Sequence, residues 1–384
     1  MRDVYIVGAA QTDIGELWNR SLMSLAVEAV RKTLAQAGGR EPDCLVVGNM
    51  LSGELASQEN LGAFVADWAG LGQVEAVKVE AACGSGGAAL REGYLRVAAG
   101  VCDCVLVVAV EKMTDQLPDA VSAGLALAAD GDYETLHGTT FVALNALIMR
   151  RYMHENGCRH EDFAGFAVNA HRNATANEHA MFRREVSAHD YAQACMVASP
   201  INLLDSSAIS DGAGALLLCA DPEAGGARRR VRVAASSAAS DTIAVATRKD
   251  PLWLSAAEVS ARRAYAQAGI GPDDVDLFEA HDAFSIMAAL SLEACGFAPR
   301  GRGVRLAMEG EIGPRGRVPI ATRGGLKARG HPVGATGVLQ VIDALVQLEG
   351  RAGASQVPGA RVALTQNIGG SGASINTHIL EAED

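Results

Sequence analysis

The chain has 384 residues, of which 49% are hydrophobic and 20% are charged, and its formal net charge is −12. This length and composition predict a globular protein of two or three domains. The acidic balance argues against nucleic acid or an anionic membrane as the main partner, although a local basic patch could still bind an anionic ligand.

Short apolar runs alternate with helical periodicity through the first 110 residues. Strands are expected where such runs end at turn residues, and helices where apolar residues recur every three or four positions. In chain order, the pattern predicts a strand at 4–7, a helix at 21–37, a strand at 44–47, a helix at 62–69, a strand at 77–80, a helix at 83–98 and a strand at 104–110. This alternation is typical of an α/β domain with a mainly parallel sheet.

The pattern changes between residues 111 and 200, where it becomes helical and loop-like, with a stretch rich in histidine and arginine at 160–184. We interpret this region as an inserted subdomain. A strand is expected again at 213–219, and 222–226 is the best candidate for a linker.

The second half repeats the plan of the first. It predicts strands at 231–235, 275–279 and 361–365 and helices at 256–268, 283–294 and 338–348. Two similar α/β halves suggest an internally duplicated fold.

The eight cysteines follow neither a disulfide framework nor the spacing of zinc ligands. Cys102 and Cys104 lead into the apolar run 105–109, so we interpret them as packing residues. The first seven residues favour a strand over a signal peptide, and no apolar run reaches membrane-spanning length. We therefore expect a cytoplasmic protein with reduced thiols and no metal site.

Cys83 stands in a glycine-rich turn between a predicted strand and a predicted helix. A thiol at the first turn of a helix feels the positive end of the helix dipole, which favours the nucleophilic thiolate. Gly84, Gly86 and Gly87 would let a substrate or another backbone come close. Because buried cysteines beside small residues are also common in cores, this stretch alone leaves catalysis and packing open.

Two histidines occupy similar turns. His281 follows the strand 275–279, and His331 lies in the glycine-rich loop 324–337 before a helix, while 365–372 forms a third glycine-rich turn. Ligand sites form at strand ends in open α/β sheets. A cysteine and two histidines there fit a Cys–His nucleophile with an oxyanion site, although either histidine alone could be a structural hydrogen-bonding group. No loop matches a nucleotide phosphate-binding motif.

Six motifs together make the chain resemble the thiolase superfamily over essentially its whole length. The fine pattern is similar to the archaeal-type and sterol-carrier-type acetyl-CoA acetyltransferase-like thiolases. These carry His-Asp where better known thiolases carry Asn-Glu, and Asn-x-Gly-Gly where those carry a second catalytic cysteine. The motifs lie at 81–87, 110–114, 210–213, 281–284, 330–337 and 365–372.

The resemblance implies the thiolase fold, with two similar α/β halves in a layered αβαβα arrangement and an inserted loop subdomain. We expect an N-terminal thiolase domain at 1–115 plus 196–224, the insert at 116–195 and a C-terminal thiolase domain at 225–384.

The resemblance also assigns roles to site residues. Cys83 would carry the acyl group as a thioester, and His331 would accept the thiol proton. His281 would donate to the thioester oxygen of the second substrate. The backbone N–H groups of Cys83 and Gly369 would form the oxyanion site. Asp282 and Asn367 are secondary candidates.

One departure from the family pattern affects the expected reaction. Thiolases usually hold a second cysteine that moves the α-proton, and it would belong near Asn367 or at Ala283; neither position is a cysteine here. We therefore expect a thiolase that makes or cleaves a non-standard, bulky or branched β-ketoacyl-CoA. The alternatives are C-acyl transfer to a non-CoA acceptor, a C–C lyase acting on a CoA thioester, and a non-catalytic acyl-CoA-binding subunit.

The resemblance implies partners as well. A coenzyme A thioester would be the substrate, with no covalently bound cofactor, and the chain would form a homodimer or a dimer of dimers. A small accessory protein with a zinc ribbon and an oligonucleotide-binding-type (OB-type) barrel could act in trans. Arg150, Arg151, Arg183 and Arg184 are candidates for contacts with CoA phosphates, although solvated surface charge explains most of them equally well.

Overall fold

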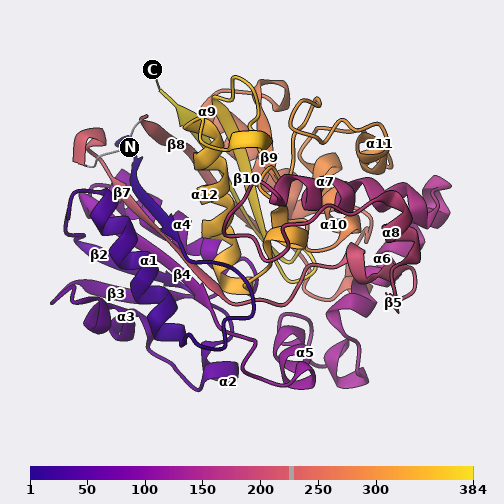
Figure 1. Ribbon diagram of the computed structural model, residues 1–384, viewed down its shortest axis with the longest axis horizontal. Helices are drawn as coiled ribbons and strands as arrows, with labels where there is room; N and C mark the ends of the chain where they lie inside the picture. The colour runs from indigo at the N-terminus through magenta and orange to yellow at the C-terminus, as the bar shows by residue number, and fades with distance from the viewer. Residues whose placement is uncertain (225–228, 384) are drawn as a thin grey trace.

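A computed structural model of the chain describes residues 1–224 and 229–383. Figure 1 shows the first half at the lower left, the second half at the upper right, and the region between them along the lower right. The strands are β1 (Tyr5–Gln11), β2 (Cys44–Gly48), β3 (Glu75–Val79), β4 (Cys104–Glu111), β5 (Met196–Ala198), β6 (Ile201–Asn202), β7 (Gly212–Cys219), β8 (Val231–Ser240), β9 (Leu277–Glu279), β10 (Val362–Gly369) and β11 (Ser374–Ala382).

The helices lie between these strands nearly where the periodicity predicts them. They are α1 (Leu22–Gln36), α2 (Ser52–Ala56), α3 (Leu61–Ala69), α4 (Ser85–Ala98), α5 (Pro118–Ala126), α6 (Phe141–Asn156), α7 (Ala164–Ala174), α8 (Ala188–Gln193), α9 (Ser255–Ala268), α10 (Ser285–Ala294), α11 (Gly303–Met308) and α12 (Thr336–Leu348). No helix among the described residues is long and apolar enough to cross a membrane.

Within the described residues, nine strands form one sheet in the order β3-β2-β4-β7-β1-β8-β11-β10-β9. The first half of the chain supplies the first five of these strands and the second half supplies the other four. The two half-sheets meet at a narrow junction, where Tyr5 of β1 pairs with Arg232 of β8. The molecule is therefore built from two halves, as the sequence predicts.

The expectation of a mainly parallel sheet is wrong. Strand β2 runs parallel to β3 and β4, and β9 runs parallel to β10, but the other neighbouring pairs are antiparallel. One reason is strand β11, which the sequence analysis does not predict: it follows β10 through a tight turn, with Gly369 opposite Ser374, and so forms a hairpin.

The alternation of side chains along β4 explains the layers. Val105 and Val107 face the apolar cluster that contains residues of α4 and α12, whereas Leu106 and Val108 face the cluster with residues of α1 and α3. Helices α9 and α10 cover the outer face of the second half-sheet (Figure 1). The order of layers is α1/α3, first half-sheet, α4/α12, second half-sheet, α9/α10, which confirms the αβαβα arrangement.

The region between β4 and β7 holds helices α5 to α8 and the short β5–β6 hairpin. Its assignment as a subdomain at 116–195, and the other domain limits, remain predictions. Of the predicted linker, Pro222–Ala224 forms a 3₁₀ turn, while Gly225 and Gly226 lie outside the described residues.

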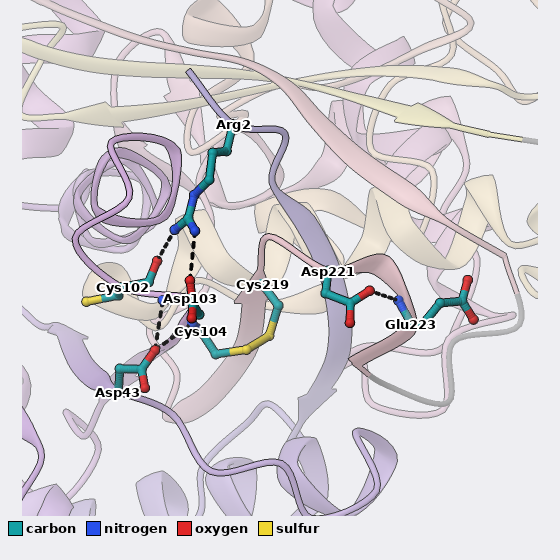
Figure 2. The surroundings of a disulfide bond; sticks show 8 residues. All are labelled: Arg2, Asp43, Cys102, Asp103, Cys104, Cys219, Asp221 and Glu223. Carbon is teal, nitrogen blue, oxygen red and sulfur yellow. Dashed lines mark hydrogen bonds and ion pairs between the residues drawn. A yellow bond between two sulfur atoms is a disulfide. The ribbon is translucent and has the colours of Figure 1, made fainter.

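One expectation about the cysteines is wrong, because Cys104 and Cys219 form a disulfide (Figure 2). Cys104 begins β4 and Cys219 ends β7, and the two residues lie opposite each other in the antiparallel register, with Cα atoms 4.2 Å apart. They are 115 positions apart in the sequence, so no local spacing indicates the pair. Cys102 remains a free, buried thiol beside it.

Candidate active site

Cys83 lies in the tight turn between β3 and α4. Ala82, just before it, adopts a left-handed conformation with φ 52°, which is strained for a residue with a side chain. The hydroxyl of Ser85 holds the turn: it donates to the carbonyl of Ala82 (2.6 Å) and accepts from the N–H of Ala81 (3.0 Å). The thiol is thereby fixed just before the start of α4, with 8% of the residue exposed.

The resting group at this position is a thiol. Burial, and to a lesser extent the neighbouring Glu111, raises the pKa of Cys83 to about 12. The expectation that the helix start favours the thiolate is therefore wrong, because desolvation of the charged form outweighs the helix dipole. A base must remove this proton before the sulfur can react.

His331 has one ring nitrogen available as a base. Its Nδ1 lies 2.6 Å from Oγ1 of Thr336, and that hydroxyl donates its single proton to the carbonyl of Pro332 (3.0 Å). The ring must therefore donate Nδ1–H to Thr336, which leaves Nε2 unprotonated. Burial lowers the pKa of His331 well below 6.5, so the ring is neutral.

His281 is held in the opposite tautomer by Asn367 of β10. The backbone N–H of Gly87 donates to Oδ1 of Asn367 (3.0 Å), which fixes the amide orientation. The Nδ2 group of Asn367 then donates to the carbonyl of Cys83 (3.1 Å) and to Nδ1 of His281 (3.1 Å). Nδ1 of His281 accepts, so Nε2 carries the proton. Burial lowers the pKa of His281 to about 3.

The three predicted catalytic residues meet at one cavity. The rings of His281 and His331 are 5.1 Å apart in an edge-to-face arrangement. Together with Cys83 they line a cavity of about 180 Å³, whose other walls are mostly apolar. The cavity thus contains a thiol, a neutral nitrogen acceptor and a neutral N–H donor, although the residues lie far apart in sequence.

Glycines allow the elements behind the cavity to approach closely. A Cβ atom on Gly337, at the start of α12, would lie 2.2 Å from the backbone nitrogen of Gly87 in α4. A Cβ atom on Gly84 would lie 3.1 Å from the backbone nitrogen of Gly369. The predicted oxyanion residue Gly369 therefore lies directly against the Cys83 turn.

The other candidate, Asp282, does not line the cavity as described. Its Oδ1 accepts from the N–H of Leu326 (2.7 Å), which lies in the π-helical turn Gly325–Arg329. Burial raises the pKa of Asp282, and the nearby Lys327 offsets only part of this rise. Asp282 therefore connects the turn of His281 to the segment that leads to His331.

Glu111 is a site residue to which the sequence analysis gives no role. It ends β4 and is fully buried, and its carboxylate accepts from the N–H groups of Met50 (3.0 Å), Leu51 (3.1 Å) and Gly334 (3.0 Å). Burial nevertheless raises its pKa to about 7. The signal that could have identified it is a carboxylate at the end of a wholly apolar strand. Glu111 holds the loop after β2 against the loop that follows His331.

The structure shows which residues occupy the expected place of a second cysteine and where the candidate CoA-binding arginines lie. Among the described residues that line the cavity, Cys83 is the one cysteine, and Ala283 forms part of the wall. Arg150 donates to the carbonyl of Ser199 (2.9 Å), and Arg151 pairs with Glu155 (2.7 Å). Neither these two arginines nor Arg183 and Arg184 are among the described lining residues.

Comparison with known proteins gives a consistent result. Residues 4–222 match the family described as "Thiolase, N-terminal domain", and residues 237–382 match "Thiolase C-terminal domain-like". An acetyl-CoA acetyltransferase of Methanothermobacter thermautotrophicus is 42% identical over 99% of this chain and 99% of its own. The benzoylsuccinyl-CoA thiolase subunit BbsB of Thauera aromatica is 32% identical over 98% of this chain and 97% of its own.

A solved structure titled "Ltp2-ChsH2(DUF35) aldolase" has the same fold, with a TM-score of 0.87 over 99% of this chain and 98% of that one, at 24% identity. The family matches extend over most of the chain, and they agree with the motifs and with the arrangement of Cys83 and the two histidines. The chain belongs to the thiolase family, and it is an acyltransferase of the thiolase type.

Proposed function

We propose that the chain makes or cleaves a β-ketoacyl-CoA through an acyl thioester on Cys83. The observation that carries this proposal is the opposite tautomers of the two histidines in one cavity: His331 presents a free nitrogen acceptor and His281 an N–H donor. Acyl transfer through a thiol and formation of an enolate need one of each.

In the cleavage direction, Nε2 of His331 accepts the thiol proton, and the sulfur attacks the β-keto carbonyl. The backbone N–H groups of Cys83 and Gly369 stabilise the resulting oxyanion. The carbon–carbon bond then breaks, leaving an acyl group on Cys83 and an enolate of the shorter CoA thioester, whose oxygen accepts from Nε2–H of His281. The enolate carbon takes up a proton, and free CoA displaces the acyl group from sulfur while its thiol proton passes through Nε2 of His331 to Cys83.

The proton for the enolate carbon has no second cysteine to carry it. Nδ1 of His281 already accepts from Asn367, and its Nε2 is protonated, so this ring has no free acceptor. His331 holds the proton that it took from Cys83, and its Nε2 belongs to the cavity wall. We infer that His331 returns this proton to the enolate carbon, directly or through a bound water, and so serves both steps.

We expect the pH profile to report a neutral His331. Because burial lowers the pKa of His331 well below 6.5, its base form is present throughout the neutral range. We therefore expect kcat/KM to fall with decreasing pH only far below pH 6.5. The measurement is kcat/KM for thiolysis of a β-ketoacyl-CoA from pH 5 to pH 9, in about half-unit steps.

Two variants control this measurement. Thr336→Val removes the acceptor that holds the tautomer and should lower kcat/KM roughly 10-fold to 100-fold at every pH, which is less than the roughly 10²–10⁴-fold contribution of a general base because the base itself remains. Thr365→Val is the matched control, because the Thr365 hydroxyl has no hydrogen-bond partner among the described residues. A fall in kcat/KM of the wild-type enzyme with its midpoint near pH 6.5 would contradict the expectation that His331 is neutral.

We propose further that the substrate is a non-standard, bulky or branched β-ketoacyl-CoA. Two observations support this: Cys83 is the one cysteine among the described lining residues, and a 32% identical relative is named a benzoylsuccinyl-CoA thiolase subunit. C-acyl transfer to another acceptor, C–C lyase activity and a silent binding role are less well supported, because a 42% identical relative is named an acetyltransferase and the nucleophile is retained.

Partners also remain proposals. We infer a homodimer or a dimer of dimers, and an accessory protein of the zinc-ribbon and OB-barrel kind. The name of the Thauera aromatica relative, which describes one subunit of an enzyme, supports a second component. Coenzyme A enters as substrate, and the reaction as written needs no metal.

The direct test is the mass of the intact protein after incubation with a panel of acyl-CoA and β-ketoacyl-CoA thioesters. We expect an added acyl group that peptide mapping places on Cys83, and none on the Cys83→Ser variant. The acyl group retained best would identify the substrate class. Turnover without any adduct on Cys83, in the presence or absence of the accessory protein, would reject the covalent route.

A further inference from the structure

The cavity beside Cys83 presents no charged side chain among the residues that the structure describes. No lysine, arginine, aspartate or glutamate is among its described lining residues. An acyl group on the sulfur would therefore meet mainly hydrocarbon and thioether surface. The largest contributors to this surface are Met113, Phe141, Phe284, Met287 and Ile368.

Four neutral polar residues complete the lining, apart from the catalytic ones: Ser122, Asn145, Ser206 and Ser207. The amide nitrogen of Asn145 already donates to the carbonyl of Phe141 (2.9 Å). Oδ1 of Asn145 and the hydroxyl oxygen of Ser206 are buried, so a ligand in the cavity cannot reach them. Ser122 and Ser207 remain, the first exposed on α5 and the second half-buried. The cavity therefore offers a ligand two hydroxyls and no charge.

The charged groups behind the cavity do not favour an anion near the sulfur. After burial, the carboxylates of Glu111 and Glu80 are what raises the pKa of Cys83. On the side of the histidines the nearest cation is Arg329, and it is fully buried in an ion pair with Asp343. An anionic substituent close to Cys83 would be repelled by two carboxylates and would meet no cation on the surface of the cavity.

The ionisable groups of the cavity respond to the same surroundings. Burial raises the pKa of Cys83 to about 12 and lowers the pKa of His281 to about 3, so both groups are held in their neutral forms. A carboxylate brought into the cavity by a substrate would be desolvated in the same way.

We propose that the acyl group taken by Cys83 is uncharged, and that the cavity excludes short acyl groups that end in a carboxylate. This inference rests on the proposed function and specifies its substrate class. Removing an ion from water without a partner is costly, and apolar walls do not offset that cost. A branched alkyl group or an aromatic ring in the same place is stabilised by burial.

The experiment compares three β-ketoacyl-CoA thioesters that differ only at the end of the acyl chain. 3-Oxoadipyl-CoA ends in a carboxylate, its terminal amide is polar but neutral, and 6-methyl-3-oxoheptanoyl-CoA ends in an isopropyl group of similar shape. We expect kcat/KM for thiolysis near pH 8 to be highest for the isopropyl substrate and lower for the amide. For the carboxylate we expect a value at least about 100-fold below that of the isopropyl substrate.

The pH dependence of this comparison separates charge from shape. A free carboxyl group has a pKa of roughly 4.3, so its neutral fraction rises about tenfold for each pH unit from pH 8 down to about pH 5. The isopropyl group does not titrate, and His331 stays neutral over this range. We therefore expect kcat/KM for the carboxylate substrate, divided by that for the isopropyl substrate, to rise by up to about tenfold per pH unit as the pH falls.

Two variants supply the missing cation. Ser122→Arg introduces it from the exposed position on α5 and should raise kcat/KM for 3-oxoadipyl-CoA about tenfold, the size of one charge-assisted hydrogen bond. Ser122→Gln is the matched control, since it lengthens the side chain without adding charge and should give no such gain. Val142→Lys introduces a cation from a half-buried position on α6 and keeps the test open if Ser122→Arg does not fold.

Four outcomes overturn the inference. Equal cleavage of the carboxylate and isopropyl substrates by wild-type enzyme would mean that the cavity accepts charge. A ratio that stays constant with pH would mean that shape, and not charge, decides. A gain with Ser122→Gln as large as with Ser122→Arg, or no gain with either cation, would have the same meaning. If no thioester is cleaved and none forms an adduct on Cys83, the proposed function itself fails, which the other outcomes do not imply.

Discussion

Replacing Cys83 with serine should abolish acyl transfer while the fold survives. The hydroxyl is a far weaker nucleophile than a thiol, and the neutral His331 is too weak a base to compensate. Loss of the nucleophile of a catalytic triad lowers kcat by a factor on the order of 10⁶. The measurements are single-turnover thiolysis and urea denaturation, and the denaturation midpoint should change little because serine fits the same turn.

The matched control is Cys195→Ser, since Cys195 is a free, exposed thiol. The Cys195→Ser variant should keep full activity. In the wild-type enzyme, the thiol of Cys195 should react with thiol reagents. Cys83→Ser enzyme that retains more than about 1% of the wild-type kcat would be inconsistent with nucleophilic catalysis by this residue.

Replacing Arg329 with methionine should produce the largest loss of stability of any single change discussed. Arg329 and Asp343 are both fully buried and form an ion pair, with Arg323 at 3.5 Å from Asp343 as its other cation. Removing one member of a buried pair leaves an uncompensated charge and costs about 3–5 kcal/mol. Arg329 stands two residues before His331, and Asp343 lies on α12, so activity should fall as well.

The free energy of unfolding by urea tests this expectation. Arg151→Met is the control, because Arg151 and Glu155 form an exposed pair on α6 and the loss should stay below about 1 kcal/mol. The double variant with Asp343→Leu should recover only part of the loss, because it replaces the pair by apolar residues but leaves the buried Arg323 without its carboxylate partner. A loss below about 1 kcal/mol for Arg329→Met alone would mean that the pair does not stabilise this part of the fold.

Much of the fold could be predicted because strand and helix lengths follow local patterns. The apolar run at 104–110 becomes β4, and the periodic stretch at 21–37 becomes α1, each within a residue or so. Strand direction depends on where the chain goes next, which local patterns do not contain. The sheet therefore differs from the predicted parallel one at two places: β11 pairs antiparallel with β10, and β7 pairs antiparallel with β4.

The candidate site was predictable for the residues that carry family motifs. Cys83, His281 and His331 do meet at one cavity, and Gly369 lies against the Cys83 turn. The protonation of these groups was not predictable, because it depends on burial and on partners such as Thr336 and Asn367. Asn145, which lines the cavity from α6, gave no signal, since an asparagine in the middle of a helix has no pattern that points to a cavity.

The disulfide between Cys104 and Cys219 changes how the chain is connected. The two cysteines are 115 positions apart, and the chain between them leaves the first half-sheet on β4, builds one wall of the cavity and returns on the adjacent strand β7. One covalent bond closes this excursion into a ring at its base. A peptide bond in the ring could be cut without dividing the molecule, so that Cys83 and His331 would remain in a single covalent unit whatever happened to the wall that faces them.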